Sequence, residues 1–116
     1  MSSRARPHAI PALRDLELVV LLAVLGLGDR AYPLTIRDAI EERGHRSVSR
    51  AAVFITLERL EAKGVVTSRF GDPTPVRGGR AKRFFTVEPL GIEAAKRALQ
   101  VVTGLTAGLE SILETK

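Results

Sequence analysis

The sequence contains no cysteine, and only 4% of its 116 residues are aromatic. The absence of cysteine excludes disulfide bonds, thiolate catalysis and cysteine-ligated zinc or iron–sulfur centres, and it is compatible with a reducing cytoplasm. Because aromatic side chains are scarce, a core must be built mostly from Leu, Val, Ile and Ala. With 45% hydrophobic and 27% charged residues, the composition fits one folded, helix-rich domain and not a disordered chain.

The patterns typical of catalytic, cofactor and membrane sites are also missing. The two histidines, His8 and His45, lack metal-ligand spacing to each other. Neither a Walker motif nor a Gly-x-Gly-x-x-Gly fingerprint after a strand occurs. The apolar run at residues 18–25 is far shorter than the roughly 20 residues that a membrane span requires. We therefore expect no enzymatic activity, no metal, no cofactor and no membrane segment.

Positive charge is concentrated in the middle third of the chain. The net charge is +5, yet between Arg43 and Arg83 alone ten Lys and Arg residues stand against three acids. An ordinary solvated face and a phosphate-binding surface explain this charge equally well when it is taken by itself. The order of the predicted elements therefore has to decide between them.

The N-terminal part predicts an arm and two helices. Residues 1–11 form a polar arm interrupted by proline, for which we expect no fixed structure. A first helix is predicted at about residues 13–27, and because it is apolar nearly all round, we expect it to be central and buried. After a turn at residues 29–33, a shorter supporting helix follows, which Gly44 stops.

The third helix and the segment after it are the most informative stretch. Ser47 or Ser49 caps a helix that ends at Gly64. The inward stripe of this helix consists of Val53, Leu57 and Leu60. Two β-branched and aromatic strands, 65–70 and 83–87, then flank twelve residues rich in glycine and proline. This order is typical of the reading helix and wing of a winged helix-turn-helix, which binds duplex DNA.

The residues expected to contact DNA lie opposite that stripe and in the wing. Ala51 permits close approach to the base edges, and Ile55 suits a thymine methyl group. An alternative interpretation has equal weight: Ile55 packs on a neighbour in a dimer, or it is an ordinary exposed aliphatic residue. Wing arginines suit phosphates or the narrow minor groove. The predicted DNA-binding residues are Ser49, Arg50, Ala51, Ile55, Arg59, Arg77, Gly78, Gly79, Arg80, Lys82 and Arg83.

A last helix is predicted from Pro89 to about Glu114. Its apolar residues recur at a spacing of three and four, and the small domain leaves nothing to cover them, which implies a partner helix. Gly104 and Gly108 form a Gly-x-x-x-Gly pattern, interpreted as close backbone approach across a dimer, with two tolerated weak spots as the alternative. The predicted dimerisation residues are Leu99, Val102, Leu105, Leu109, Ile112 and Leu113.

Together these elements predict a mainly α fold with a small β-hairpin (α+β), a winged helix-turn-helix with a C-terminal dimerisation helix. The expected parts are a flexible N-terminal arm (1–11), a DNA-binding domain (12–88) and the dimerisation helix (89–116).

Residues 49–66 and 78–91 resemble the PadR family of winged-helix transcriptional regulators. The resemblance rests on the third helix, on Gly78-Gly79-Arg80 before two adjacent phenylalanines, and on the Pro-x-Gly start of the last helix. With the first-helix run and the turn at Tyr32, it covers about residues 13–99. Phe54 stands where the family usually has a tyrosine, so the resemblance implies that a hydroxyl contact to a phosphate is lost.

The resemblance implies a cytoplasmic homodimer, usually a repressor, that binds a short inverted repeat of double-stranded DNA through the third helix and the wing. It leaves open whether the protein responds to a small-molecule effector. Two other interpretations also stay open: a winged-helix protein-interaction module without DNA binding, and an RNA- or ribosome-associated basic protein.

Overall fold

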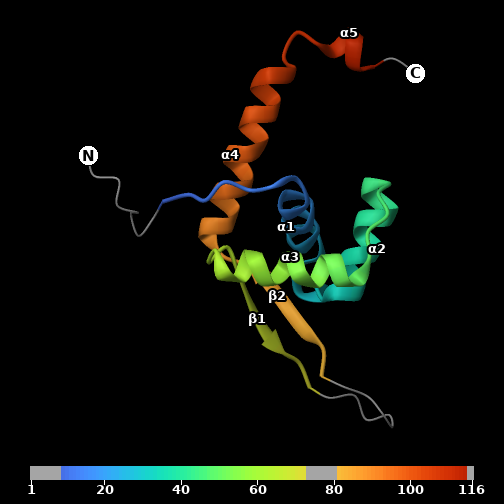
Figure 1. The fold of residues 1–116 in the computed structure, drawn as a ribbon, viewed down its shortest axis with the longest axis vertical. Coiled ribbons are helices and arrows are strands. Elements are labelled where there is room, and N and C mark those ends of the chain that lie inside the picture. Colours follow the sequence, from blue (N-terminus) through green and yellow to red (C-terminus); the bar gives the residue numbers. More distant parts are fainter. Residues whose placement is uncertain (1–8, 73–80, 115–116) are drawn as a thin grey trace.

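The chain folds into a helical body from which a β-hairpin and a long helix project in opposite directions (Figure 1). The computed structural model describes residues 9–72 and 81–114. The elements in these residues are α1 (Asp15–Leu27), the 3-10 turn η1 (Gly28–Arg30), α2 (Pro33–Gly44), α3 (Arg50–Ala62), β1 (Val66–Phe70), β2 (Arg83–Val87), α4 (Pro89–Thr106) and α5 (Glu110–Leu113). The predicted class, mainly helical with one small hairpin, is confirmed.

The core lies between α1, α2, α3 and the base of the hairpin. It is aliphatic, as the scarcity of aromatic residues predicts, and Phe85 of β2 is the largest of its fully buried side chains. The first turns of α4 close the core from the side of the hairpin through two alanines. Its members are Val20, Leu21, Val24, Ala31, Ile36, Ile40, Val53, Leu57, Leu60, Val65, Val66, Phe85, Ala94 and Ala95.

Local chemistry sets the ends of the two helices of the helix-turn-helix. Pro33 opens α2 because its fixed φ suits the first helical position, so the preceding turn ends one residue earlier than predicted. The second helix, α2, ends at Gly44 as predicted, and the left-handed residue after it is His45, with a φ of 53°. Ser49 is the cap of α3, since its Oγ accepts a hydrogen bond from the Ala52 N–H at 3.0 Å.

The hairpin is an antiparallel pair in which Val66 lies opposite Val87 and Phe70 lies opposite Arg83. It is tied to the body at its base, because the Phe85 N–H donates to the Ala31 carbonyl at 2.9 Å. Since side chains alternate between the faces of a strand, one face of the hairpin looks toward α3 and the core. The outer face carries Arg69 and Phe84, and Phe84 meets the Tyr32 ring at the start of α2.

The first helix is less buried than predicted. Its inner face is fully covered, but Leu22 and Leu25 are 37% and 41% exposed. Its central position is confirmed, since α1 packs against α2, α3, β2 and α4. Burial all round was wrong, because an apolar composition does not show how many neighbours a helix has. In this small body α1 has neighbours on part of its circumference, and its outer face stays open.

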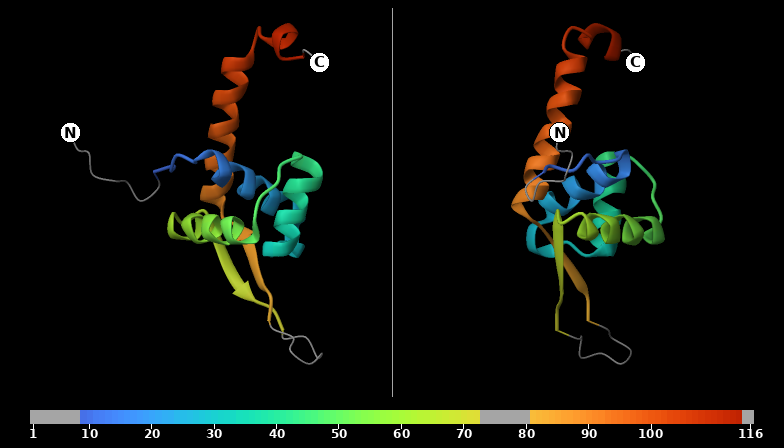
Figure 2. Two further views of the ribbon diagram at one scale, coloured as in Figure 1. Left: turned by 45° about the vertical axis from the view of Figure 1, so that its right-hand side comes forward. Right: turned by 60° about the vertical axis from the view of Figure 1, so that its left-hand side comes forward.

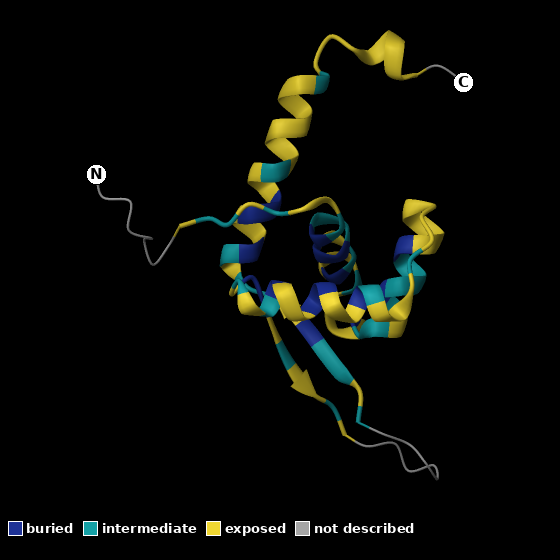
Figure 3. Cartoon of the chain, in the orientation of Figure 1, coloured by how far each residue is buried: buried dark blue, intermediate teal, exposed yellow. Residues whose placement is uncertain are grey.

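The last helix is shorter than predicted. It ends at Thr106, and Gly108 takes a φ of 87°, which an L side chain rarely adopts. The chain therefore turns before α5, which lies off the α4 axis in both views of Figure 2. Gly108 lies outside α4, so the Gly-x-x-x-Gly pattern does not form one helix face. Figure 3 shows that α4 from Leu99 onward and all of α5 are exposed, except for the half-buried Thr106.

No single helix among residues 9–72 and 81–114 is long and apolar enough to cross a membrane. By length and composition alone, Asp15–Arg30 and Pro33–Gly44 pass that test only as a pair that is bent by 120°.

Candidate nucleic-acid interface

The outer face of α3 brings together the helix residues that the sequence predicts for DNA contact. Ser49, Arg50, Ala51, Ile55 and Arg59 are all exposed. On the opposite side of the helix, the predicted stripe is completely buried, and Thr56 extends it. Periodicity therefore placed both faces of α3 correctly.

The electrostatics of this face favour an anion. In the described part of the chain, neither Arg50 nor Arg59 forms an ion pair with a carboxylate, so their charges are available to a ligand. Ala51 follows Arg50 in the first turn of α3 and adds only a small side chain to this face. Ile55 is 52% exposed and adds an aliphatic group to a charged surface.

The outer face of the hairpin carries two further cations, which are held by aromatic rings. The Lys82 ammonium lies 4.6 Å from the centre of the Tyr32 ring, and the Arg69 guanidinium lies 5.0 Å from the centre of the Phe84 ring. The two rings meet edge to face at 5.4 Å. The sequence predicts Lys82 but misses Arg69, although strand alternation puts Arg69 directly opposite Phe84. Four other predicted wing residues, Arg77, Gly78, Gly79 and Arg80, lie outside the described residues.

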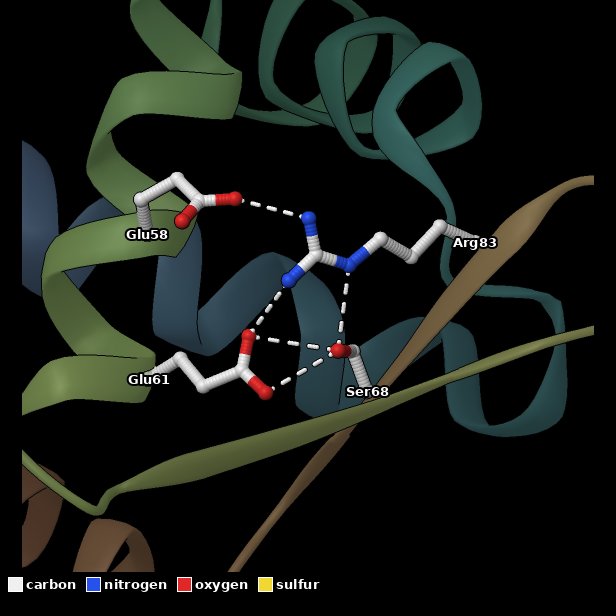
Figure 4. Close-up of polar contacts among 4 residues, drawn as sticks. All are labelled: Glu58, Glu61, Ser68 and Arg83. Atoms are coloured by element: carbon white, nitrogen blue, oxygen red, sulfur yellow. Dashed lines mark hydrogen bonds and ion pairs between the residues drawn. The ribbon is translucent and has the colours of Figure 1, made fainter.

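Arg83 differs from the other predicted DNA-binding residues because its side chain turns toward α3 (Figure 4). Nη1 and Nη2 form ion pairs with the Glu58 and Glu61 carboxylates, each at 2.7 Å. The Arg83 side chain is only 23% exposed. The structure therefore groups Arg83 with the contacts between the wing and the helix, and not with the free cations. Sequence reasoning missed this because the two carboxylates are 22 and 25 residues away along the chain.

A buried ion pair fixes the C-terminal end of α3 to α1. Glu17 is 2% exposed, and its carboxylate accepts hydrogen bonds from Lys63 Nζ at 2.6 Å and from the Arg14 N–H at 2.8 Å. Burial by itself raises the pKa of Glu17, but these hydrogen bonds and the positive charges of Lys63 and Arg14 outweigh it and hold the pKa below its usual value. The pair thus orients the reading helix without using a residue of its outer face.

The predicted dimerisation residues lie far from this interface, on α4 and beyond it. Val102 and Leu105 of α4 are 51% and 73% exposed. The other four, Leu99, Leu109, Ile112 and Leu113, are exposed as well.

Comparison with known proteins identifies this arrangement. The fold is similar to a transcriptional regulator from Clostridium thermocellum, at 19% identity and a TM-score of 0.67, with 86% of this chain and 90% of that chain covered. It is also similar to a PadR family regulator from Eggerthella lenta, at 20% identity and a TM-score of 0.64, with coverage of 87% and 89%. Bacillus subtilis PadR in complex with operator DNA matches at 20% identity and a TM-score of 0.61, with coverage of 74% and 48%. Among curated proteins, none matches the sequence.

The reading helix with its exposed outer face, followed by a hairpin that carries basic residues, defines a winged helix-turn-helix of the DNA-binding class. The family model described as "Transcriptional regulator PadR-like family" matches residues 21–97, and the chain belongs to this family. Members of the family are DNA-binding transcriptional regulators and not enzymes.

Proposed function

We propose that the protein is a homodimeric transcriptional repressor of the cytoplasm that binds an inverted-repeat operator through α3 and the wing. The observation that carries this proposal is the outer face of α3, where Arg50 and Arg59 flank small and aliphatic side chains and have no acidic partner in the described part of the chain. Such a face fits phosphates at its edges and base edges at its centre. The operator complex of Bacillus subtilis PadR, whose fold is similar, supports the same mode of binding.

In this proposal, residues 12–88 bind DNA and residues 89–116 dimerise. Two exposed apolar surfaces support a dimer. One is the second half of α4, and the other is the outer face of α1 with Leu22 and Leu25. A twofold dimer presents two reading helices to two half-sites, which is why the operator is expected to be an inverted repeat.

Selection of genomic DNA fragments on the purified full-length protein tests this function directly. We expect enrichment of one inverted repeat, and an affinity for it that falls with salt at a log–log slope of about −0.9 per phosphate contact. Replacing Arg50 or Arg59 by Gln is expected to lower that slope by about 1 per protomer. Arg97→Gln removes the same charge from an exposed position of α4 and serves as the matched control.

Three results would contradict the proposal. Absence of DNA enrichment, or a salt-independent interaction, would favour a protein-interaction module. Equal binding of double-stranded RNA would favour an RNA-associated protein, because the A-form major groove does not admit a reading helix. Increased transcription from the selected operator in the presence of the protein would contradict the repressor role.

Measuring binding to the selected operator with added metabolite fractions tests whether a small-molecule effector releases the DNA.

A further inference from the structure

Arg83 connects three elements through one hydrogen-bonded cluster (Figure 4). Its ion pairs reach α3, and its Nε–H donates to the Ser68 hydroxyl of β1 at 3.0 Å. The Ser68 hydroxyl in turn lies 3.0 Å and 3.2 Å from the two carboxylate oxygens of Glu61, to which it donates. Each nitrogen of the guanidinium therefore has a partner, and the partners come from both the reading helix and the neighbouring strand.

Aromatic rings from the same three elements surround this guanidinium. Its central carbon lies 5.1 Å from the ring centre of Phe85, 5.5 Å from that of Phe54 and 6.0 Å from that of Phe70. These distances are within the range of cation–π attraction. The rings also reduce the access of water, which strengthens the two ion pairs relative to fully exposed ones.

The cluster lies at the point where the paired part of the hairpin ends. Arg83 is the first residue of β2, and its partner Phe70 is the last residue of β1. The next contact outward is the hydrogen bond from the Gly71 N–H to the Lys82 carbonyl at 2.7 Å. A two-stranded hairpin is only marginally stable by itself, so its direction depends on what holds its base.

We propose that Arg83 is a positioning residue that locks the base of the wing, strands β1 and β2, to the reading helix, so that α3 and these two strands meet DNA as one rigid unit. This role rests on the proposed DNA-binding function and deepens it. It replaces the direct DNA contact that the sequence predicts for Arg83. Loss of the lock is expected to let the wing move relative to α3, and wing contacts then contribute less to binding.

The test is a double-mutant cycle between the lock and the wing, measured on the selected operator with the full-length dimer. In the wild type, Arg80→Ala is expected to weaken binding about tenfold. In an Arg83→Gln background, the same Arg80→Ala change is expected to weaken binding less than twofold, because the unlocked wing has already lost its contribution. A direct DNA contact by Arg83 predicts instead that the two losses multiply, which would overturn the proposal.

Arg69→Gln is the matched control for this cycle. It removes the same charge from the same end of the hairpin, but Arg69 stacks on Phe84 on the other face of the hairpin and makes no ion pair within the described residues. The effect of Arg80→Ala is expected to remain about tenfold in this background. An equal loss of the Arg80 effect in both backgrounds would show that charge alone, and not the lock, is responsible.

Glu61→Gln gives a second test whose sign separates the two explanations. The change removes a negative charge near the DNA-binding surface, so simple electrostatics predicts tighter binding. The lock predicts weaker binding, by about fivefold, and a smaller Arg80→Ala effect. Because this variant keeps the Arg83–Glu58 pair, it also carries the test if Arg83→Gln fails to fold, as judged by its helical circular dichroism. Tighter binding by Glu61→Gln would overturn the proposal.

These outcomes separate the proposal from the function on which it rests. If the wild type binds no DNA, the proposed function fails. If the wild type binds the operator and Arg80→Ala weakens it equally in all backgrounds, DNA binding stands and the lock is refuted.

Discussion

The two halves of α4 have opposite environments although both are rich in apolar residues. In the first half the buried residues are small, namely Gly91, Ala94 and Ala95, and they pack against the body. In the second half the apolar residues are large, and Val102 and Leu105 are exposed. In a solitary domain the reverse order is usual, because large aliphatic side chains gain most from burial.

This inversion shows that one helix serves two contacts. Small residues let the first half approach the body closely enough for backbone to meet backbone. The large residues of the second half extend past the body, where the described part of this chain provides no cover for them (Figure 3). Exposed apolar area of this kind marks a surface for another molecule, and here we have proposed a second copy of the chain.

The largest effect is expected from a variant that breaks the contact between the first half of α4 and the body. A Cβ at Gly91 would collide with the Val65 carbonyl oxygen and lie 2.8 Å from Val87 Cγ1. We expect Gly91→Ala to lower the free energy of unfolding by about 3 kcal/mol, measured by urea unfolding. Gly104→Ala in the second half is the control: nothing lies within 4 Å of its Cβ, and the free energy of unfolding should stay constant or rise by up to about 1 kcal/mol. Similar losses for both variants would contradict the contrast between the two halves.

The next largest effect is expected from a variant that breaks the proposed dimer contact of the second half of α4. We expect Val102→Glu to raise the dissociation constant of the dimer at least about 100-fold, or about 2.7 kcal/mol, because a charge would replace apolar area at the interface. Light scattering over a dilution series measures this change. Gln100→Glu adds the same charge to an exposed polar position of the same helix and should leave the dimer intact. A wild-type protein that is monomeric at micromolar concentration would refute the proposed dimer.

A smaller effect concerns the buried pair inside the body. We expect Glu17→Gln to lower the free energy of unfolding by about 2 kcal/mol at pH 7, because it leaves Lys63 without its buried anion. The pKa of Glu17 is lower in the folded state than in the unfolded chain, so its contribution is complete above its ordinary pKa and is lost as the pH falls through the folded-state pKa.

Unfolding curves of wild type and Glu17→Gln should therefore converge as the pH is lowered below about 4. Glu93→Gln is the control, because Glu93 forms only an exposed pair with Lys96 at 3.4 Å, and it should change the stability little. A difference between wild type and Glu17→Gln that persists unchanged at low pH would contradict the assigned ionisation.

The smallest effect distinguishes two kinds of exposed aliphatic residue. Ile55 is as exposed as Val102 but lies among the cations of α3. We expect Ile55→Ala to relax the preference for one thymine per half-site at a cost of about 1 kcal/mol, with thermal stability and dimer mass little changed. Binding to a panel of single-base operator variants measures this. A large drop in melting temperature would show that Ile55 packs the fold, and a monomer would show that it packs the dimer.

Local sequence signals predicted much of the fold and the exposure of the outer face of α3. The inward stripe of α3 and the bounds of β2 were correct because periodicity and β-branched or aromatic composition act over a few residues. One of the two candidate caps, Ser49, was also correct. The turn at Gly108 was missed, because a glycine inside an apolar repeat is compatible with a continuous helix. Only the backbone conformation, with a φ of 87° at Gly108, shows that the helix has ended before it.

The sequence by itself determined which face of α3 looks inward, the aliphatic nature of the core and the family. These follow from side-chain periodicity and residue type, which are local properties. Tertiary structure alone decided that Arg83 turns inward to Glu58 and Glu61 while Arg50 and Arg59 stay free, and that α1 keeps an open face. The reason is that the partners of a charge and the number of neighbours of a helix depend on segments far apart in the chain, which only folding brings together.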